Sequence, residues 1–262
     1  MLIAVVQLGT VDYATGLRLQ SDLIAARKDN RVPDTLLLLE HKPVITLGRN
    51  AKQQNVLLSR ELLEKKGVEL FETDRGGDVT FHGPGQLVGY PIFDLHGFPT
   101  NGTSSLKYLG AVDYVRRIEE VLIRTCLEYH VPTKRIKGLT GVWTDWGAES
   151  SDAKIAAIGV HISRSVTSHG FALNVNTDLD YFKLIVPCGI SDKPVTSLGQ
   201  ELERAVDMDE VAQCVSRNFS RVFERQMVPV ATVDELLGRT VDMPARAPKE
   251  VQAITGDYTT WA

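Results

Sequence analysis

The sequence is poor in cysteine and has no long apolar run. Only three cysteines occur in 262 residues, at positions 126, 188 and 214. An odd number of widely spaced cysteines is a poor disulfide framework and is typical of a reducing compartment, so we expect a cytoplasmic protein. No apolar run approaches the roughly 20 residues needed to cross a bilayer. The run Leu2–Leu8 is too short for a signal-peptide core and has no basic residue before it, so we predict no membrane association.

An excess of basic residues is also lacking. Lys and Arg number 29 against 33 Asp and Glu, which gives a net charge of -4. A nucleic-acid-binding protein normally needs a concentrated basic face, so we expect no nucleic-acid partner. The content of 43% hydrophobic and 24% charged residues is typical of a globular protein and excludes disordered, collagen-like and coiled-coil classes.

The common metal and nucleotide motifs are missing as well. The sequence contains no HExxH, CxxC or short His-x-His arrangement, and no GxxxxGK[ST] phosphate-binding loop. The glycine-rich segment 83–89 has the wrong spacing for a dinucleotide fingerprint, and Pro84 would remove a backbone donor. We therefore expect neither a metal ion nor a cofactor.

The apolar pattern predicts clusters of strands around few helices. This pattern favours an α/β (α+β) fold, with one domain on a mixed β-sheet over residues 1–227 and a loosely packed C-terminal extension over 228–262. Thr35–Glu40 and Val44–Leu47 are predicted to form a hairpin. We predict further strands at 2–8, 68–73, 141–145, 154–162 and 171–175, two more around the turn 82–85, and helices at 13–30, 61–66, 208–226 and from Ser104 or Ser105 to about 129.

Cys188 differs from the other two cysteines. Cys126 and Cys214 fall within predicted helices, where a cysteine is usually a small buried hydrophobe. Cys188 stands between a proline and a glycine, which can hold a thiol rigidly with free space beside it. A catalytic thiol needs a base or a cation nearby, and Lys154, at the start of a predicted strand, is one candidate. A Cys–His pair with His82 or His169 is another, and a purely structural role for Cys188 also stays open.

Four segments carry a family resemblance. The segment 75–88, RGGDVTFHGPGQLV, closely resembles the signature of the lipoyl(octanoyl) transferase family, which attaches octanoyl groups in protein lipoylation. The segments 154–159, 169–174 and 187–190 (the last followed by 195–198) are similar to further blocks in the order found in the family. The resemblance runs from the N-terminus to about Leu198 and more loosely to about Gln226.

This resemblance implies a fold, a site and partners. The fold would be the biotin/lipoate protein ligase catalytic domain, acting as a monomer. By motif position, Cys188 matches the nucleophile that carries the acyl thioester, and Lys154 matches its partner. The donor would be octanoyl-acyl carrier protein, and the acceptors would be lipoyl-domain proteins and the glycine cleavage H protein. The segments that match the acyl pocket comprise Arg75, Gly76, Gly77, Asp78, Val79, Thr80, Phe81, His82, Ala157, Ile158, Gly159, Gly170, Phe171 and Ala172.

Two other functions are compatible with the same sequence features. A ligase of the same fold would activate lipoate or biotin with ATP and would not need Cys188. A non-catalytic protein that binds acyl groups or lipoyl domains would leave Cys188 without a chemical role. The missing phosphate-binding loop favours ATP-independent octanoyl transfer over the ligase.

Overall fold

A mixed β-sheet forms the centre of the molecule. The computed structural model describes residues 1–99, 108–147, 152–186 and 193–239, and within these ranges eight strands join one sheet. Pairing is parallel between β1 and its two neighbours and antiparallel elsewhere, so the predicted mixed sheet is confirmed. The strands are, in spatial order, β11 (Gln226–Pro229), β1 (Leu2–Val11), β2 (Asp34–His41), β6 (Gln86–Ile92), β10 (Val166–Asn174), β9 (Lys154–Ser163), β8 (Leu139–Thr144) and β7 (Thr133–Ile136).

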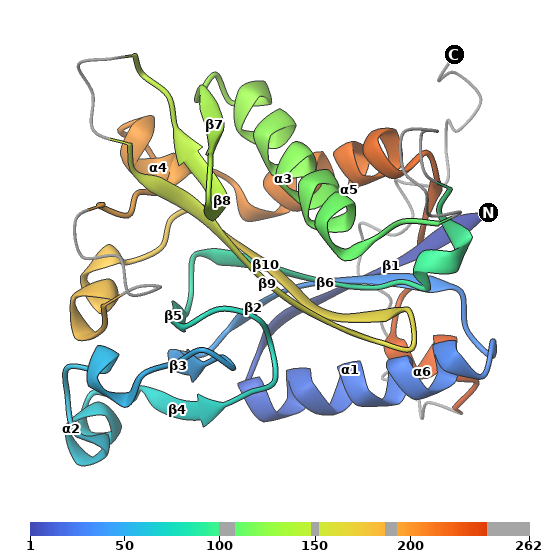
Figure 1. The fold of residues 1–262 in the computed structure, drawn as a ribbon, viewed down its shortest axis with the longest axis horizontal. Helices are drawn as coiled ribbons and strands as arrows, with labels where there is room; N and C mark the ends of the chain where they lie inside the picture. Colours follow the sequence, from blue (N-terminus) through green and yellow to red (C-terminus); the bar gives the residue numbers. More distant parts are fainter. Residues whose placement is uncertain (100–107, 148–151, 187–192, 240–262) are drawn as a thin grey trace.

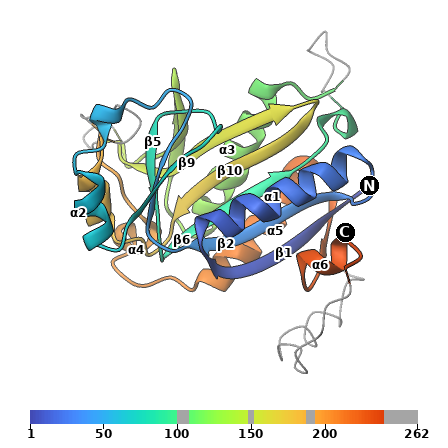
Figure 2. The same ribbon diagram turned by 90° about the horizontal axis from the view of Figure 1, so that it is seen from below.

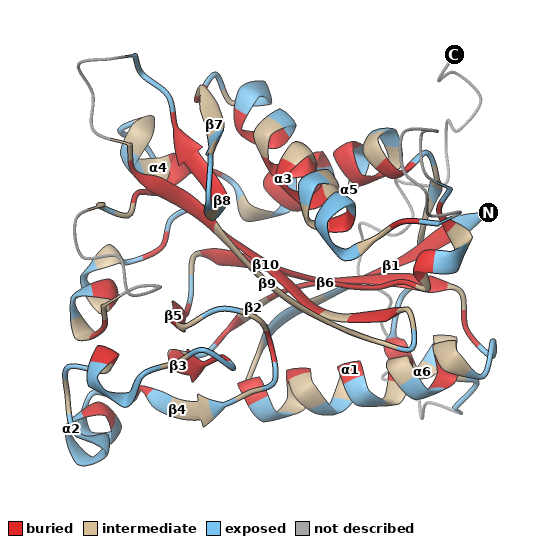
Figure 3. Ribbon diagram, viewed as in Figure 1, coloured by how far each residue is buried: buried red, intermediate tan, exposed pale blue. Residues whose placement is uncertain are grey.

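Helices cover both faces of this sheet (Figures 1 and 2). The helices α3 (Ala111–Glu128) and α5 (Met208–Phe223) pack on one face, while α1 (Tyr13–Lys28) and α6 (Val233–Leu236) pack on the other. The central strands are therefore buried on both faces, which explains the continuous apolar run Leu36–Leu39 in β2 (Figure 3). No helix in the described part of the chain has both the length and the apolar character needed to cross a membrane.

A second, smaller sheet lies beside the first. It contains β3 (Val44–Leu47) between β4 (Glu69–Glu72) and β5 (Val79–His82). The predicted hairpin of β2 and β3 is therefore wrong: β2 already has β1 and β6 on its two sides, so β3 leaves the large sheet after Pro43. The shorter helices are α2 (Arg60–Lys65), α4 (Leu198–Glu201) and the 3-10 turns η1 (Gln53–Asn55), η2 (Leu95–Gly97) and η3 (Leu179–Leu184).

Two predicted helix boundaries also differ from the structure. The helix α3 begins at Ala111 rather than near residue 104. Just before it, the N–H group of Leu109 donates to the carbonyl oxygen of Phe98 at 2.9 Å, a contact outside the helix. Ser104 and Ser105 lie outside the described residues. The helix α5 ends at Phe223, since Glu224 adopts a left-handed conformation with φ of 54°.

The chain after α5 continues into the fold. The strand β11 pairs with β1 and crosses the expected boundary at residue 227. Val233 of α6 is buried against the sheet. The described part of the expected extension, 228–239, therefore packs on the domain, while residues 240–262 lie outside the described ranges.

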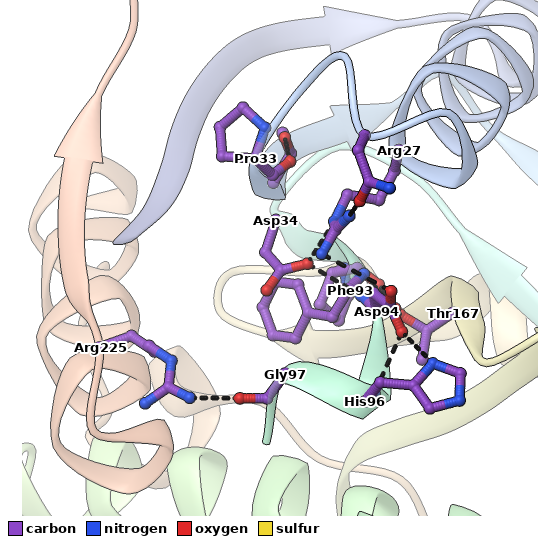
Figure 4. A network of polar contacts seen from close by, with 12 residues as sticks. Arg27, Pro33, Asp34, Phe93, Asp94, His96, Gly97, Thr167 and Arg225 are labelled. Atoms are coloured by element: carbon purple, nitrogen blue, oxygen red, sulfur yellow. Dashed lines mark hydrogen bonds and ion pairs between the residues drawn. The ribbon is translucent and has the colours of Figure 1, made fainter. Parts of the chain in front are cut away.

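Polar contacts fix the start of β2 (Figure 4). The guanidinium of Arg27, at the end of α1, donates to Asp34 at 2.7 Å, and the N–H group of Asp94 donates to the same carboxylate oxygen at 2.8 Å. Arg225 donates to the carbonyl oxygen of Gly97 at 2.5 Å, which ties the end of α5 to η2. These contacts hold α1, β2 and η2 in register around the end of β6.

Candidate active site

A pocket lies between the segment 75–82 and the strands β6, β9 and β10. All the sequence-predicted acyl-pocket residues line it except Val79 and Phe81. The lining consists of Tyr13, Arg75, Gly76, Gly77, Asp78, Thr80, His82, Val88, Tyr90, Ala157, Ile158, Gly159, His169, Gly170, Phe171 and Ala172.

Val79 and Phe81 belong to the opposite side of β5. Successive side chains of a strand point to opposite faces, so Thr80 and His82 reach the pocket while Val79 and Phe81 turn away from it. Both are buried in a cluster with Ile45 and other apolar residues of the small sheet. The ring of Phe81 stacks on Tyr181 with ring centroids 4.6 Å apart. These two side chains support the pocket from behind.

Small residues form the floor of the pocket. In the pairing of β9 with β10, Ala157 lies opposite Ala172 and Gly159 lies opposite Gly170. Gly159 also permits a close approach of the segment above it, since a Cβ atom there would stand only 2.7 Å from the carbonyl oxygen of Gly76. The floor is therefore apolar. The backbone of Gly76 lies above it and forms part of the roof of the pocket.

Arg75 and Asp78 build the roof rather than project freely into the pocket. The guanidinium of Arg75 is buried and donates to the carbonyl oxygen of Thr46 and to that of Asp78, both at 2.7 Å. The carboxylate of Asp78 accepts a hydrogen bond from the side-chain amide of Asn55 at 2.6 Å. The roof is thus tied to β3 and η1 by charge-assisted hydrogen bonds.

Buried aromatic and imidazole rings form the inner wall. Burial lowers the pKa of His82 to about 3 and that of His41, which lies behind the wall, to about 4, so both rings are neutral near pH 7. The imidazole of His41 is 2.6 Å from the hydroxyl of Tyr90. Burial also raises the pKa values of Tyr13 and Tyr90, so the wall carries no net charge.

Lys154 begins β9, as predicted, and is buried. Its N–H group donates to the carbonyl oxygen of Pro194 at 2.8 Å, and its carbonyl oxygen accepts from the N–H group of Thr196 at 2.9 Å. Its side-chain nitrogen lies 4.7 Å from the ring centroid of Trp143, within reach of a cation–π contact when the group is protonated. Lys154 is not on the pocket lining and precedes the lining residue Ala157 by three residues on β9.

Cys188 lies outside the described residues, but both flanks of its segment are described. On the N-terminal side, the N–H group of Val186 donates to the carbonyl oxygen of Asn55 at 2.8 Å. On the C-terminal side, Pro194 is bound to Lys154. Cys126 and Cys214 are buried as predicted, and burial raises the pKa values of their thiols to about 12 and about 11.

Sequence reasoning missed several residues of the site. Tyr13 reaches the pocket from α1, far away in the sequence, and no local signal marks it. Tyr90 follows Val88 by two residues on the same strand, so the period of two could have placed both on the pocket face. Within the described ranges, no group of three or more His, Cys, Asp or Glu side chains is placed to hold a metal ion.

Comparison with known proteins identifies the family. The lipoyl protein ligase A/B catalytic domain matches residues 12–220. The chain is 57% identical over 256 residues to an octanoyltransferase of Koribacter versatilis, covering 98% of each chain, and 55% identical over 239 residues to an octanoyltransferase of Acidobacterium capsulatum, covering 90% of this chain and 96% of the relative. A putative lipoate protein ligase from T. acidophilum with bound lipoic acid shares the fold, with a TM-score of 0.64, 14% identity and coverage of 91% of this chain and 92% of the other. Together with these octanoyltransferases, the chain therefore belongs to the family of the lipoyl protein ligase A/B catalytic domain.

Proposed function

We propose that this protein is an acyltransferase of lipoate biosynthesis, which moves an octanoyl group from octanoyl-acyl carrier protein to a specific lysine of lipoyl-domain proteins and of the glycine cleavage H protein. The relatives named octanoyltransferase support the reaction class. The proposed intermediate is an octanoyl thioester on Cys188, with Lys154 as its proton-transfer partner. We assign the reaction to the cytoplasm, where a free thiol stays reduced.

In the first half-reaction, the side-chain amine of Lys154, in its neutral form, takes the proton of the Cys188 thiol and becomes an ammonium group. The thiolate attacks the carbonyl carbon of the donor thioester, and the bond to the carrier sulfur breaks. The carrier leaves as a thiol after it receives the proton from Lys154. The octanoyl group is then held on Cys188, with its chain in the pocket.

In the second half-reaction, the ε-amine of the acceptor lysine attacks the Cys188 thioester. An amide forms, the Cys188 sulfur leaves, and the proton lost by the amine returns through Lys154 to the thiol. An amide replaces a thioester, which is downhill, so the reaction needs no ATP. A nucleotide site is therefore unnecessary for this chemistry, in agreement with the missing phosphate-binding loop.

The pocket suits an acyl chain. Ala157, Gly159, Gly170 and Ala172 give it a narrow apolar floor, and the rings of its inner wall are neutral. Burial of about seven methylene or methyl groups at ~0.8 kcal/mol each supplies roughly 5–6 kcal/mol. This free energy would hold the chain while the carrier leaves and the acceptor arrives.

The observation that carries the proposal is the anchoring of the segment around Cys188. Its C-terminal flank is bound to Lys154 through Pro194 and Thr196. Its N-terminal flank is bound to Asn55, which in turn binds Asp78 of the pocket lining. In the sequence, Cys188 follows the first anchor, Val186, by two residues and precedes the second anchor, Pro194, by six.

Intact-protein mass spectrometry after incubation with octanoyl-acyl carrier protein tests the mechanism. We expect the mass to increase by one octanoyl group in the absence of ATP and to remain unchanged in Cys188→Ser. Cys126→Ala and Cys214→Ala are matched controls that should retain the adduct. No adduct on the wild type would refute the thioester mechanism, and an adduct that requires ATP would favour the ligase.

Lys154→Ala tests the proton-transfer role. We expect acylation to slow by a factor on the order of 10² to 10⁴, the range usual for general acid–base catalysis, in a protein that remains folded. Lys193→Ala is the control, because the Lys193 ammonium also lies near the Trp143 ring, at 5.7 Å from its centroid, but has no assigned role in proton transfer. Unchanged acylation in Lys154→Ala would remove this lysine from the mechanism.

A further inference from the structure

The pocket extends along β9 away from Lys154. The lining residues Ala157 and Gly159 follow Lys154 on this strand, and the next residue, Val160, is paired with His169 of β10. At about 3.3 Å per residue, His169 lies roughly 20 Å along the strand from Lys154 and roughly 10 Å beyond Ala157. His169 therefore marks the far end of the pocket, opposite the lysine.

The size of the side chains changes sharply at this end. Between Lys154 and His169, the floor consists of the facing pairs Ala157–Ala172 and Gly159–Gly170. His169 then brings an imidazole ring onto the lining, and the phenol ring of Tyr90 meets it edge to face with centroids 6.5 Å apart. The narrow apolar floor ends at these two rings.

The ring of His169 is fixed in place. Its Nε2 is 2.7 Å from a carboxylate oxygen of Asp74, and the backbone N–H group of His169 donates to the side-chain oxygen of Gln20 at 2.7 Å. The other carboxylate oxygen of Asp74 is hydrogen-bonded to Nδ1 of His161. Asp74 directly precedes the roof segment 75–78, so its carboxylate joins the roof to both strands of the β9–β10 hairpin.

His169 has features that its packing alone does not require. Its backbone adopts a left-handed conformation with φ of 54°, which is uncommon for a residue other than glycine. Since Nε2 faces a carboxylate, it carries the proton, and Nδ1 is then a buried acceptor without a hydrogen-bond partner among the described residues. Burial lowers the pKa of the ring, which favours its neutral form. Such an unpaired buried atom costs free energy, and a role at the pocket end would account for its retention.

We propose that His169, positioned by Asp74, is the residue that limits the length of the acyl chain this protein accepts. This inference rests on the proposed function, because it assigns the pocket to the acyl chain. With the carbonyl carbon of the octanoyl group beside Ala157, roughly 10 Å from His169 along the strand, the methyl end of the extended chain lies against the imidazole ring. A chain longer by two carbons collides with the ring, which Asp74 holds at Nε2 while Gln20 holds the backbone N–H group of the same residue.

Competition between donors tests this assignment. Octanoyl-, decanoyl- and dodecanoyl-acyl carrier proteins are mixed, and the ratio of acyl adducts formed at early times gives the ratio of the kcat/KM values. His169→Gly removes the ring at a φ that glycine adopts freely, and His169→Asn is a second variant, since asparagine also tolerates this conformation. Asp74→Asn keeps the size of the side chain but weakens its hold on the ring.

We expect the decanoyl-to-octanoyl ratio to rise about tenfold in His169→Gly and His169→Asn and by a smaller factor in Asp74→Asn. Tenfold corresponds to about 1.4 kcal/mol. This ratio does not depend on the folded fraction of a variant, so a purely structural role of His169 would leave it unchanged. His130→Gly is the matched control, because His130 is exposed and has a similar φ of 61°.

The outcomes separate this inference from the proposed function. An unchanged ratio in both His169 variants overturns the assignment of His169, even when octanoyl loading proceeds normally. Failure of the wild type to form any octanoyl adduct overturns the proposed function itself. An equal rise in the ratio for His130→Gly would show that the effect does not arise at the pocket end.

Discussion

The carbonyl oxygen of Lys154 accepts a hydrogen bond from the backbone N–H group of Thr196 at 2.9 Å. The carbonyl oxygen of Thr196 in turn accepts from the side-chain amide of Asn174 at 2.8 Å. Gln86 donates to the side-chain oxygen of Asn174 at 2.9 Å, and its own side-chain oxygen is 2.7 Å from Nδ1 of His82. An unbroken chain of hydrogen bonds therefore connects His82 in the pocket wall to Lys154 at the start of β9.

Asn174→Ala should break this chain at its centre. The amide of Gln86 and the carbonyl of Thr196 would each lose a buried partner, so we expect a loss of stability of about 1–3 kcal/mol, measured by urea unfolding. We also expect acylation to slow at saturating donor, because Thr196, which binds the backbone of Lys154, loses its support.

Asn176→Ala is the matched control for this variant. Asn176 also forms two side-chain hydrogen bonds, both to Val206, at 2.7 and 2.9 Å. Neither of its partners contacts Lys154, so this variant should lose comparable stability while its acylation rate stays near that of the wild type. Equal slowing in both variants would show that stability, rather than positioning, controls the rate.

Gly141→Ala should perturb the surroundings of Lys154 directly. A Cβ atom at Gly141 would stand 2.6 Å from the carbonyl oxygen of Ala156 and 3.6 Å from Cε of Lys154, on a backbone with φ of 122°. We expect a loss of more than about 2 kcal/mol in the free energy of unfolding, from strain and from the clash together, and slower acylation.

Gly138→Ala separates the strain from the clash. Gly138 lies in the same β7–β8 hairpin and also has a positive φ, 83°, but a Cβ atom there meets no other atom within 4 Å. Its alanine variant should show only the cost of the backbone conformation, about 1 kcal/mol, and an unchanged acylation rate. Equal losses of stability in the two variants would contradict the role given to the Ala156 contact.

Local features of the fold were accessible from the sequence. Ser59 caps α2 and Gly67 follows this helix with φ of 69°, as its turn chemistry predicts, and Lys154 begins β9. The alternation of Val79 and Phe81 with Thr80 and His82 also contained the information about which residues face the pocket.

Strand pairing was not accessible in the same way. The strands β2 and β3 look like a hairpin locally, but β1 and β6 compete for the edges of β2 from 20 or more residues away along the chain. Tyr13 reaches the pocket only because α1 crosses the large sheet. Such long-range contacts depend on the free energy of the whole fold. Local periodicity in the sequence does not determine that free energy.

Thiol alkylation should distinguish the three cysteines. Burial raises the pKa of Cys126 to about 12 and that of Cys214 to about 11, so neither forms an appreciable amount of thiolate near pH 7. In the native protein we expect iodoacetamide to add one group, at Cys188, and to add none to Cys188→Ser. In urea the wild type should take up three groups and Cys188→Ser two. Rapid labelling of native Cys188→Ser would contradict the burial of the other two thiols.

The stability of the protein should fall in mild acid because of two buried histidines. Burial lowers the pKa of His41 to about 4 and that of His82 to about 3, whereas both would titrate near 6.5 in the unfolded chain. Below pH 6.5 the unfolded state binds more protons than the native state, so each group favours unfolding by about 1.4 kcal/mol per pH unit between about 6 and its native pKa.

We expect the free energy of unfolding, measured in urea at pH 7.5, 6 and 5, to decrease along this series. His41→Gln should show a shallower decrease, because it lacks the contribution of His41. Burial raises the pKa of Asp34, which acts in the opposite direction, but this contribution is the same in the wild type and in His41→Gln and cancels when the two are compared. An equally steep decrease in His41→Gln would refute the role of His41.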